Sequence, residues 1–108
     1  MTSATQDILR VSVERDGPCV VVRLDGDVDF GTGPRLDAAL ARVLEAGAQI
    51  VVDLGGVGFV DRAGVAWLLA AGREATRRGA TLVVRAPRRP VARLLARSGV
   101  DRLVTVEW

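Results

Sequence analysis

The 108-residue sequence contains no histidine, no lysine, no tyrosine and only one cysteine. Because histidine is the commonest general base and a frequent zinc ligand, its absence argues against catalytic triads and zinc sites. Since every basic residue is arginine, a phosphate-binding loop of the Gly-x-x-x-x-Gly-Lys type is excluded. Cys19 has no partner for a disulfide, and its apolar surroundings are typical of a small buried hydrophobic residue. An enzyme is therefore the weaker expectation, and the sequence indicates no cofactor and no metal.

Long hydrophobic runs are also missing. The longest, at residues 65–71, is far shorter than the roughly 20 residues that a membrane span requires. The first ten residues are polar and include an acid, so no secretory signal is visible. With 49% hydrophobic residues and a net charge of +2, the chain fits a single globular domain over residues 1–108, with residues 1–7 as a loose tail. We expect a cytoplasmic protein without a membrane partner.

The periodicity of apolar residues predicts an α/β fold. Residues 9–14 alternate between apolar and polar, and a turn at residues 16–18 joins them to an apolar run at 19–24. Helical patterns follow at residues 33–46, 62–78 and 88–98, with Thr32 or Gly33 expected to cap the first helix. Short strand patterns lie between and after them. The order ββαβαβαβ predicts a mixed, mostly parallel β-sheet opened by an antiparallel hairpin, with helices packed against it.

Residues 50–71 form the central segment of this pattern. They begin as a β-branched run, typical of a strand buried on both faces, cross a glycine-rich loop, and end as an apolar helix. In open α/β sheets, functional surfaces lie at the carboxyl ends of parallel strands. Right-handed connections place the loop at 58–64 on the same side as the acidic loop at 25–30. We therefore expect the functional site at these two loops.

Three other features each admit two interpretations. Asp53 ends the central strand like the phosphoacceptor of a response-regulator receiver, but that site also needs a lysine; bracing of the loop is the alternative. The glycines at 55, 56 and 58 can cradle a phosphate or simply permit a turn. The arginines near 77–97 fit a nucleic-acid surface or a solvated helix face. With few aromatic residues and nearly as many acids as bases, we expect no direct binding of nucleic acid.

Three segments together resemble the STAS family (sulphate transporter and anti-sigma factor antagonist). They are LDGDVD at 24–29, VVDL at 51–54 followed by FVDRAG at 59–64, and VARLLARSGV at 91–100. The resemblance covers residues 8–107 and is strongest to the single-domain anti-sigma factor antagonists. It implies a non-enzymatic module that binds an anti-sigma factor, a serine kinase of histidine-kinase-like fold, and so frees a sigma factor for transcription. The alternative is a STAS-like small-ligand-binding or structural subunit of a signalling or lipid-transport assembly.

The sequence departs from the family at the position of its phosphoacceptor. The family places a serine or threonine after the loop aspartate, whereas this chain has Arg62 followed by Ala63. Neither side chain accepts phosphate, so the usual electrostatic switch is not expected. Arg62 also places a cation at the positive end of a helix dipole, which costs ~0.3–1 kcal/mol. Either Arg62 has a functional role there, or it points into solvent or pairs with Asp27 or Asp29.

The predicted partner-binding surface combines the two loops with the start of the following helix. Trp67 lies at the flank of that helix, as either the edge of the core or an interface anchor. Asp61 is expected to cap the helix. The predicted partner-binding residues are Asp27, Asp29, Phe30, Asp61, Arg62, Ala63, Val65 and Trp67.

Overall fold

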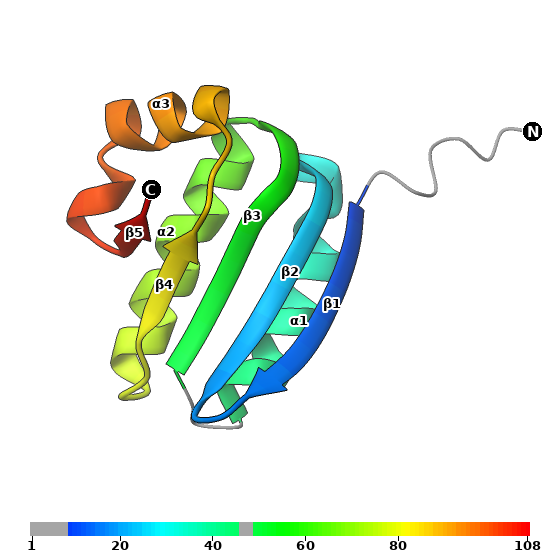
Figure 1. Cartoon of the computed structure of the whole chain (residues 1–108), viewed down its shortest axis with the longest axis vertical. Helices are drawn as coiled ribbons and strands as arrows, with labels where there is room; N and C mark the ends of the chain where they lie inside the picture. The colour runs from blue at the N-terminus through cyan, green and yellow to red at the C-terminus, as the bar shows by residue number, and fades with distance from the viewer. Residues whose placement is uncertain (1–8, 46–48) are drawn as a thin grey trace, which may run out of the picture.

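The computed structural model describes residues 9–45 and 49–108, which form one five-stranded sheet with three α-helices (Figure 1). The predicted tail at residues 1–7 lies outside the described residues. The strand order is β1-β2-β3-β4-β5; β1 and β2 are antiparallel and the other neighbours are parallel. This confirms the predicted fold class. The strands are β1 Leu9–Asp16, β2 Cys19–Val28, β3 Gln49–Val60, β4 Leu82–Arg85 and β5 Thr105–Glu107.

The three predicted helices are present close to their expected bounds. They are α1 Gly33–Glu45, α2 Arg62–Arg77 and α3 Arg89–Ser98, accompanied by short 3-10 turns η2 Phe30–Thr32 and η3 Val100–Arg102. Gly79 follows α2 and Gly99 caps α3, with φ angles of 75° and 78°. This left-handed conformation ends a helix at little cost only in glycine, which is why the sequence located these two ends correctly.

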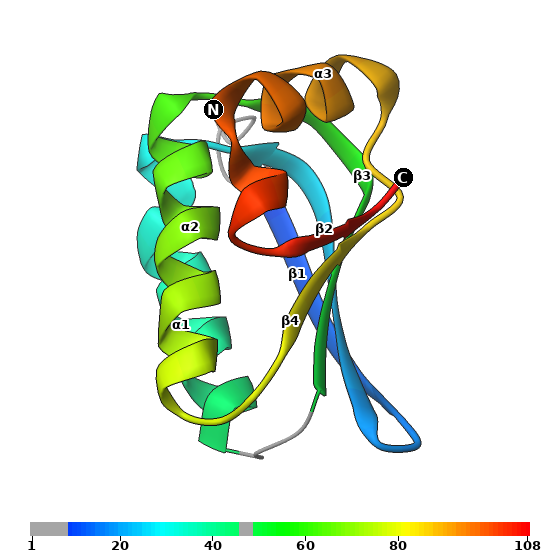
Figure 2. The same ribbon diagram turned by 90° about the vertical axis from the view of Figure 1, so that its left-hand side faces the viewer.

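One face of the sheet carries the core. Helices α1 and α2 lie side by side against it, and α3 lies at the end where β3 finishes (Figure 2). Along β3, Ile50, Val52 and Leu54 are fully buried, whereas Val51 and Asp53 between them are only half-buried. The expectation that this strand is buried on both faces is therefore wrong. Among the described residues, no helix packs against the opposite face of the sheet (Figure 2).

The glycine-rich segment after Leu54 is strand rather than loop. β3 continues to Val60, and β2 continues to Val28 beside it, with register shifts between Arg23 and Asp25 and between Gly26 and Asp27. A Cβ atom on Gly56 would lie 2.9 Å from Asp25 Oδ1 and 3.0 Å from the Leu24 carbonyl oxygen. The glycine therefore allows two irregular strands to approach closely. The predicted loops at 25–30 and 58–64 are consequently shorter than expected.

Candidate functional site

The ends of β2 and β3 meet beside the start of α2. Val28 pairs with Val60 in the parallel register, and the Asp61 N–H donates to the Val28 carbonyl at 3.2 Å. The two segments therefore lie side by side, as predicted. They meet at the end of the sheet where the chain passes from β3 into α2 (Figure 1). What remains of the two loops is Asp29 with η2 on one side and the single residue Asp61 on the other.

Asp61 holds this junction together with its carboxylate. Its Oδ1 accepts the Gly64 N–H at 2.8 Å, which is the predicted N-cap of α2. Its Oδ2 accepts the Phe30 N–H at 3.3 Å, a bond to the neighbouring segment that the sequence did not reveal. Both oxygens are thus engaged within the chain. Asp61 therefore ties the start of α2 to the segment that follows β2.

Gly64 allows α2 to start directly against β2. A Cβ atom at this position would lie 2.3 Å from the Val28 carbonyl oxygen and 2.8 Å from Val60 Cγ1. Real Cβ atoms essentially never lie within 3.0 Å of such neighbours. Any side chain at residue 64 would therefore push the helix start away from the strand ends. The glycine of the FVDRAG segment is therefore required by packing.

Asp29 organises the second half of the junction. Its carboxylate accepts the Thr32 N–H at 3.2 Å, and the Thr32 hydroxyl in turn accepts the Asp29 N–H at 3.0 Å, a reciprocal capping box. Thr32 is buried. The expected cap at Thr32 or Gly33 is wrong, because a 3-10 turn capped by Asp29 precedes α1. Like Asp61, Asp29 has a local structural role.

Two aromatic side chains are exposed at this junction. Phe30 is 83% exposed and Phe59 is 51% exposed, although both are large hydrophobic residues. Phe59 pairs in register with half-buried Asp27, and the Phe30 N–H is bonded to Asp61, two residues after Phe59. Phe59 was not among the predicted site residues, because no sequence pattern distinguishes an exposed phenylalanine from a buried one in a strand. Exposed aromatic side chains are typical anchors of protein interfaces.

Arg62 stands at the first position of α2 with its side chain exposed. Within residues 9–45 and 49–108, no ion pair includes it. The alternative pairing with Asp27 or Asp29 is therefore wrong, and the guanidinium projects into solvent. Ala63 beside it is half-buried. Among the described residues, the helix start thus carries an exposed guanidinium without an ion-pair partner, three residues after Phe59 in the chain. We call the exposed set Phe30, Phe59 and Arg62 the junction surface.

Val65 and Trp67 lie deeper than predicted. Val65 is only 8% exposed and belongs to the core, so its side chain is not available for a partner. Val65 lies on the buried face of α2, together with Leu68 and Gly72. Trp67 packs against the core edge, and its indole Nε1 donates to Asp37 Oδ1 of α1 at 2.8 Å. Of the two interpretations of Trp67, the structure shows the core edge.

Asp53 braces the uncovered face of the sheet. Its carboxylate accepts the Gly55 N–H at 2.8 Å and pairs with Arg85 at 3.2 Å and Arg23 at 3.7 Å. Burial raises the pKa of Asp53, but the Gly55 bond and the two guanidinium groups outweigh it and hold the pKa below its ordinary value. A carboxylate engaged in this way has a structural role, which agrees with the bracing interpretation.

The arginines of α3 form an exposed face. Arg89, Arg93 and Arg97 are exposed, and Arg88 Nε donates to the Gly55 carbonyl at 2.9 Å. Among the described residues, no group of three His, Cys, Asp or Glu side chains is placed to hold a metal ion. In the same part of the chain, no helix is long and apolar enough to cross a membrane.

The described residues thus combine a mixed sheet, a helix start capped by Asp61, two exposed phenylalanines and an exposed arginine. The family model described as "Mlab, STAS domain" matches residues 11–105, and the chain belongs to the STAS family. The anti-sigma factor antagonist fold within it is generally a non-enzymatic binding module. No match was found among curated proteins.

Solved structures share this fold. An anti-sigma factor antagonist from Mycobacterium paratuberculosis is 26% identical with a TM-score of 0.78, over 92% of this chain and 85% of that one. The phosphorylated form of SpoIIAA, a Bacillus cell fate determinant, is 20% identical with a TM-score of 0.68, over 92% of each chain. The murine anion transporter Slc26a9 is 17% identical with a TM-score of 0.72, over 85% of this chain and 16% of that one. The last two show the fold alone.

Proposed function

We propose that this chain is a non-enzymatic regulator that binds an anti-sigma factor and so frees a sigma factor for transcription in the bacterial cytoplasm. The partner is a serine kinase of histidine-kinase-like fold. The observation that carries the proposal is the junction surface, two exposed phenylalanines and an exposed arginine, on a fold shared with an anti-sigma factor antagonist over most of both chains.

The residues of the junction have two different roles in binding. Asp29 and Asp61 hold η2 and the start of α2 in place through their bonds to main-chain N–H groups. The surface is therefore preorganised, which reduces the entropy lost on binding. Phe30 and Phe59 supply apolar area that becomes buried, and Arg62 orients an acidic patch of the partner.

The absence of a phosphoacceptor gives the proposal a regulatory consequence. With Arg62 and Ala63 at the usual position, the kinase cannot add a charge of about −1.5 to −2 at the helix start. The chain remains competent to bind whatever the ATP supply. Control of this regulator then depends on its concentration or on the partner.

A pull-down from the source cell, with this chain as bait, tests the proposal. Recovery of an anti-sigma kinase supports it. A second candidate, a structural subunit of a signalling or lipid-transport assembly, is favoured by the occurrence of this fold within an anion transporter. Recovery of transporter subunits without an anti-sigma factor would establish the second candidate instead.

Binding kinetics with the recovered partner then test the surface. Arg62→Glu should slow association, most strongly at low salt, because a rim charge acts mainly on the encounter rate. Arg97→Glu makes the same charge change on α3 and is the matched control. Phe30→Ala should speed dissociation about tenfold or more, whereas Leu103→Ala, which also truncates an exposed hydrophobic residue, should not. Equal effects of test and control variants would contradict the assignment.

A further inference from the structure

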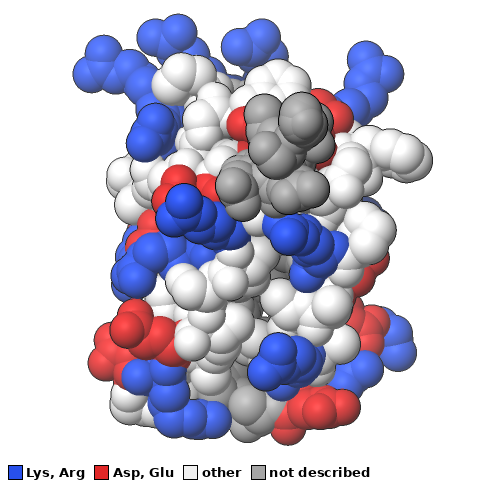
Figure 3. Space-filling view, turned by 90° about the vertical axis from the view of Figure 1, so that its right-hand side faces the viewer, with Lys and Arg blue, Asp and Glu red and all other residues white. Residues whose placement is uncertain are grey.

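A second surface lies along β1, the strand at one lateral edge of the sheet, between β1 and α1. A hollow of about 790 Å³ follows the strand there, and an adjoining one of about 400 Å³ shares three of its residues, Val11, Val13 and Arg42. Figure 3 shows this edge of the molecule, with separate basic side chains standing around an uncharged strip. None of the residues of the junction surface lines either hollow. We call the two hollows together the β1 groove.

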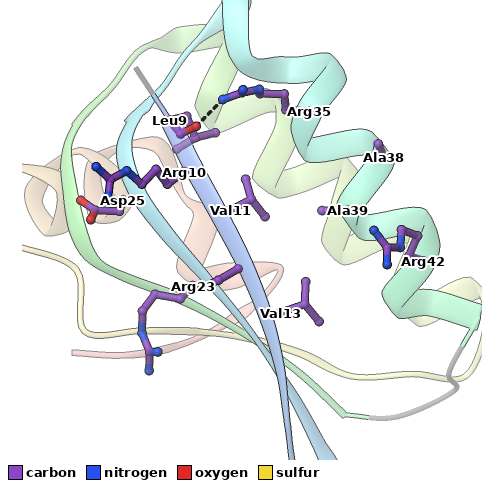
Figure 4. Close-up of a pocket in the computed structure, with 11 residues that line it drawn as sticks. Leu9, Arg10, Val11, Val13, Arg23, Asp25, Arg35, Ala38, Ala39 and Arg42 are labelled. Atoms are coloured by element: carbon purple, nitrogen blue, oxygen red, sulfur yellow. Dashed lines mark hydrogen bonds between the residues drawn. The ribbon is translucent and has the colours of Figure 1, made fainter. Parts of the chain in front are cut away.

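The groove is open because small side chains face the strand across it. In Figure 4, Val11 and Val13 project from β1 toward α1, which presents Ala38 and Ala39 at that point. Alanine is too short to fill the space, so Val13 stays 50% exposed although it lies on the core side of the sheet. The floor of the groove is therefore apolar and unfilled.

Among residues 9–45 and 49–108, no strand pairs with the outer side of β1 along the same groove. In the hairpin, Asp16 pairs with Cys19 across a two-residue turn, and the register continues without a shift to Leu9. Because inward and outward main-chain groups alternate in an antiparallel pair, Leu9, Val11 and Val13 direct their N–H and C=O groups away from β2. The Arg35 guanidinium donates to the Leu9 carbonyl, which shows this outward direction. The groups of Val11 and Val13 are placed to pair with an additional strand.

The charges around the groove are almost all positive. Arg35 stands at one end, and Arg15 and Arg42 stand at the other. Among the described residues that line the groove, the only carboxylate is that of Asp25. Asp25 pairs in register with Arg10 and lies on the far side of β1 from α1 (Figure 4). The charge complement of such a groove is an acidic occupant.

We propose that the β1 groove binds an extended acidic segment of a protein partner, which pairs with β1 as a sixth strand. Strand addition satisfies the outward main-chain groups of Val11 and Val13, and alternate side chains of the segment reach the apolar floor. Its acidic residues meet Arg35 at one end and Arg42 at the other. A second copy of this chain is a poorer occupant, because an antiparallel β1–β1 pairing would bring these arginines of the two copies toward each other.

The test uses the full chain and a fluorescein-labelled heptapeptide that alternates glutamate with valine. A peptide with lysine in place of glutamate is the control. Anisotropy should show saturable binding of the acidic peptide only, and amide resonances of residues 11–15 should shift on addition. Arg42→Glu should weaken binding about tenfold or more. Arg97→Glu changes the same charge away from the groove and should weaken it less than about twofold.

Two further variants separate the strand edge from its floor. Val13→Pro removes one outward N–H and should abolish binding, since proline blocks an edge strand. Ala39→Leu fills the floor without altering the strand and should also abolish binding, which keeps the test decisive if the proline variant fails to fold. Absence of saturable binding up to about 1 mM, equal binding of the lysine peptide, or equal effects of Arg42→Glu and Arg97→Glu would overturn the proposal. A dimer of the free chain that Val13→Pro converts to monomer would assign the groove to a second copy instead.

Discussion

Gly64→Ala is the most informative single substitution for the architecture of the junction. The added methyl group would stand 2.3 Å from the Val28 carbonyl oxygen and 2.8 Å from Val60 Cγ1. The first of these atoms belongs to the main chain of a central strand and cannot rotate away. The start of α2 must therefore move outward by about an ångström, since normal contacts of this kind lie above 3 Å.

The cost of this movement can be bounded. Overpacking of a tight contact costs about 1–3 kcal/mol. The Asp61 N–H bond to Val28, at 3.2 Å, stretches with the same motion, and losing it costs about 1 kcal/mol. Alanine recovers about 1 kcal/mol through its better helix propensity. The expected net loss is about 1–3 kcal/mol in the free energy of unfolding.

Urea unfolding followed by circular dichroism measures this loss. Gly33→Ala is the matched control, because Gly33 also lies in the first turn of a helix but has no atom within 4 Å of the position of a Cβ. It should stabilise the chain by up to about 1 kcal/mol. If Gly64→Ala is as stable as Gly33→Ala, the close approach of α2 to β2 is wrong. Gly64→Ala should also weaken partner binding, since it displaces Arg62.

The remaining predictions concern the two structural aspartates and the lost phosphoacceptor. Asp61→Ala should cost about 1–2 kcal/mol in urea unfolding, as expected for a helix cap, and an unchanged midpoint would contradict the cap. Because the pKa of Asp53 is lower in the folded chain than its unfolded value near 4, its stabilisation is complete above about pH 4 and is lost as the pH falls through the folded pKa. Asp53→Asn should therefore flatten the decline of stability below about pH 4, and an equally steep decline would contradict the ion pairs. After incubation with ATP and the partner kinase, mass spectrometry should find residues 59–66 unmodified. Phosphate uptake there by Arg62→Ser would show that only the acceptor is missing. No uptake by this variant would argue that the partner is not a kinase.

The element order was predictable because the two periodicities of the sequence are strong and the helix ends carry glycines. The lengths of β2 and β3 were not, because glycine signals a turn far more often than a strand. Gly55, Gly56 and Gly58 nevertheless lie within β3. At Gly56 the glycine is needed because β2 lies so close to β3. This closeness is a property of the folded chain and is not visible in the sequence.

The two segments of the candidate site lie side by side as predicted, but the roles of several of their residues differ from those expected. Acidic residues in a loop predict a charged surface, yet Asp29 and Asp61 bind main-chain N–H groups within the fold. Val65 falls near the start of a helix by sequence, but it lies on the buried face of α2 and belongs to the core. Phe59 is recognised as a candidate site residue only because the structure shows its side chain exposed. Such details depend on contacts between segments that are distant in sequence.

The most direct test of the proposed function is displacement of a sigma factor. The chain is titrated into a preformed complex of the sigma factor with the anti-sigma factor, and free sigma factor is measured by transcription from its promoter. The proposal predicts release that saturates at one chain per anti-sigma factor, is unaffected by prior incubation with ATP, and requires higher concentrations of Arg62→Glu than of Arg97→Glu. A sigma factor that stays bound at saturating concentrations of the folded chain would contradict it.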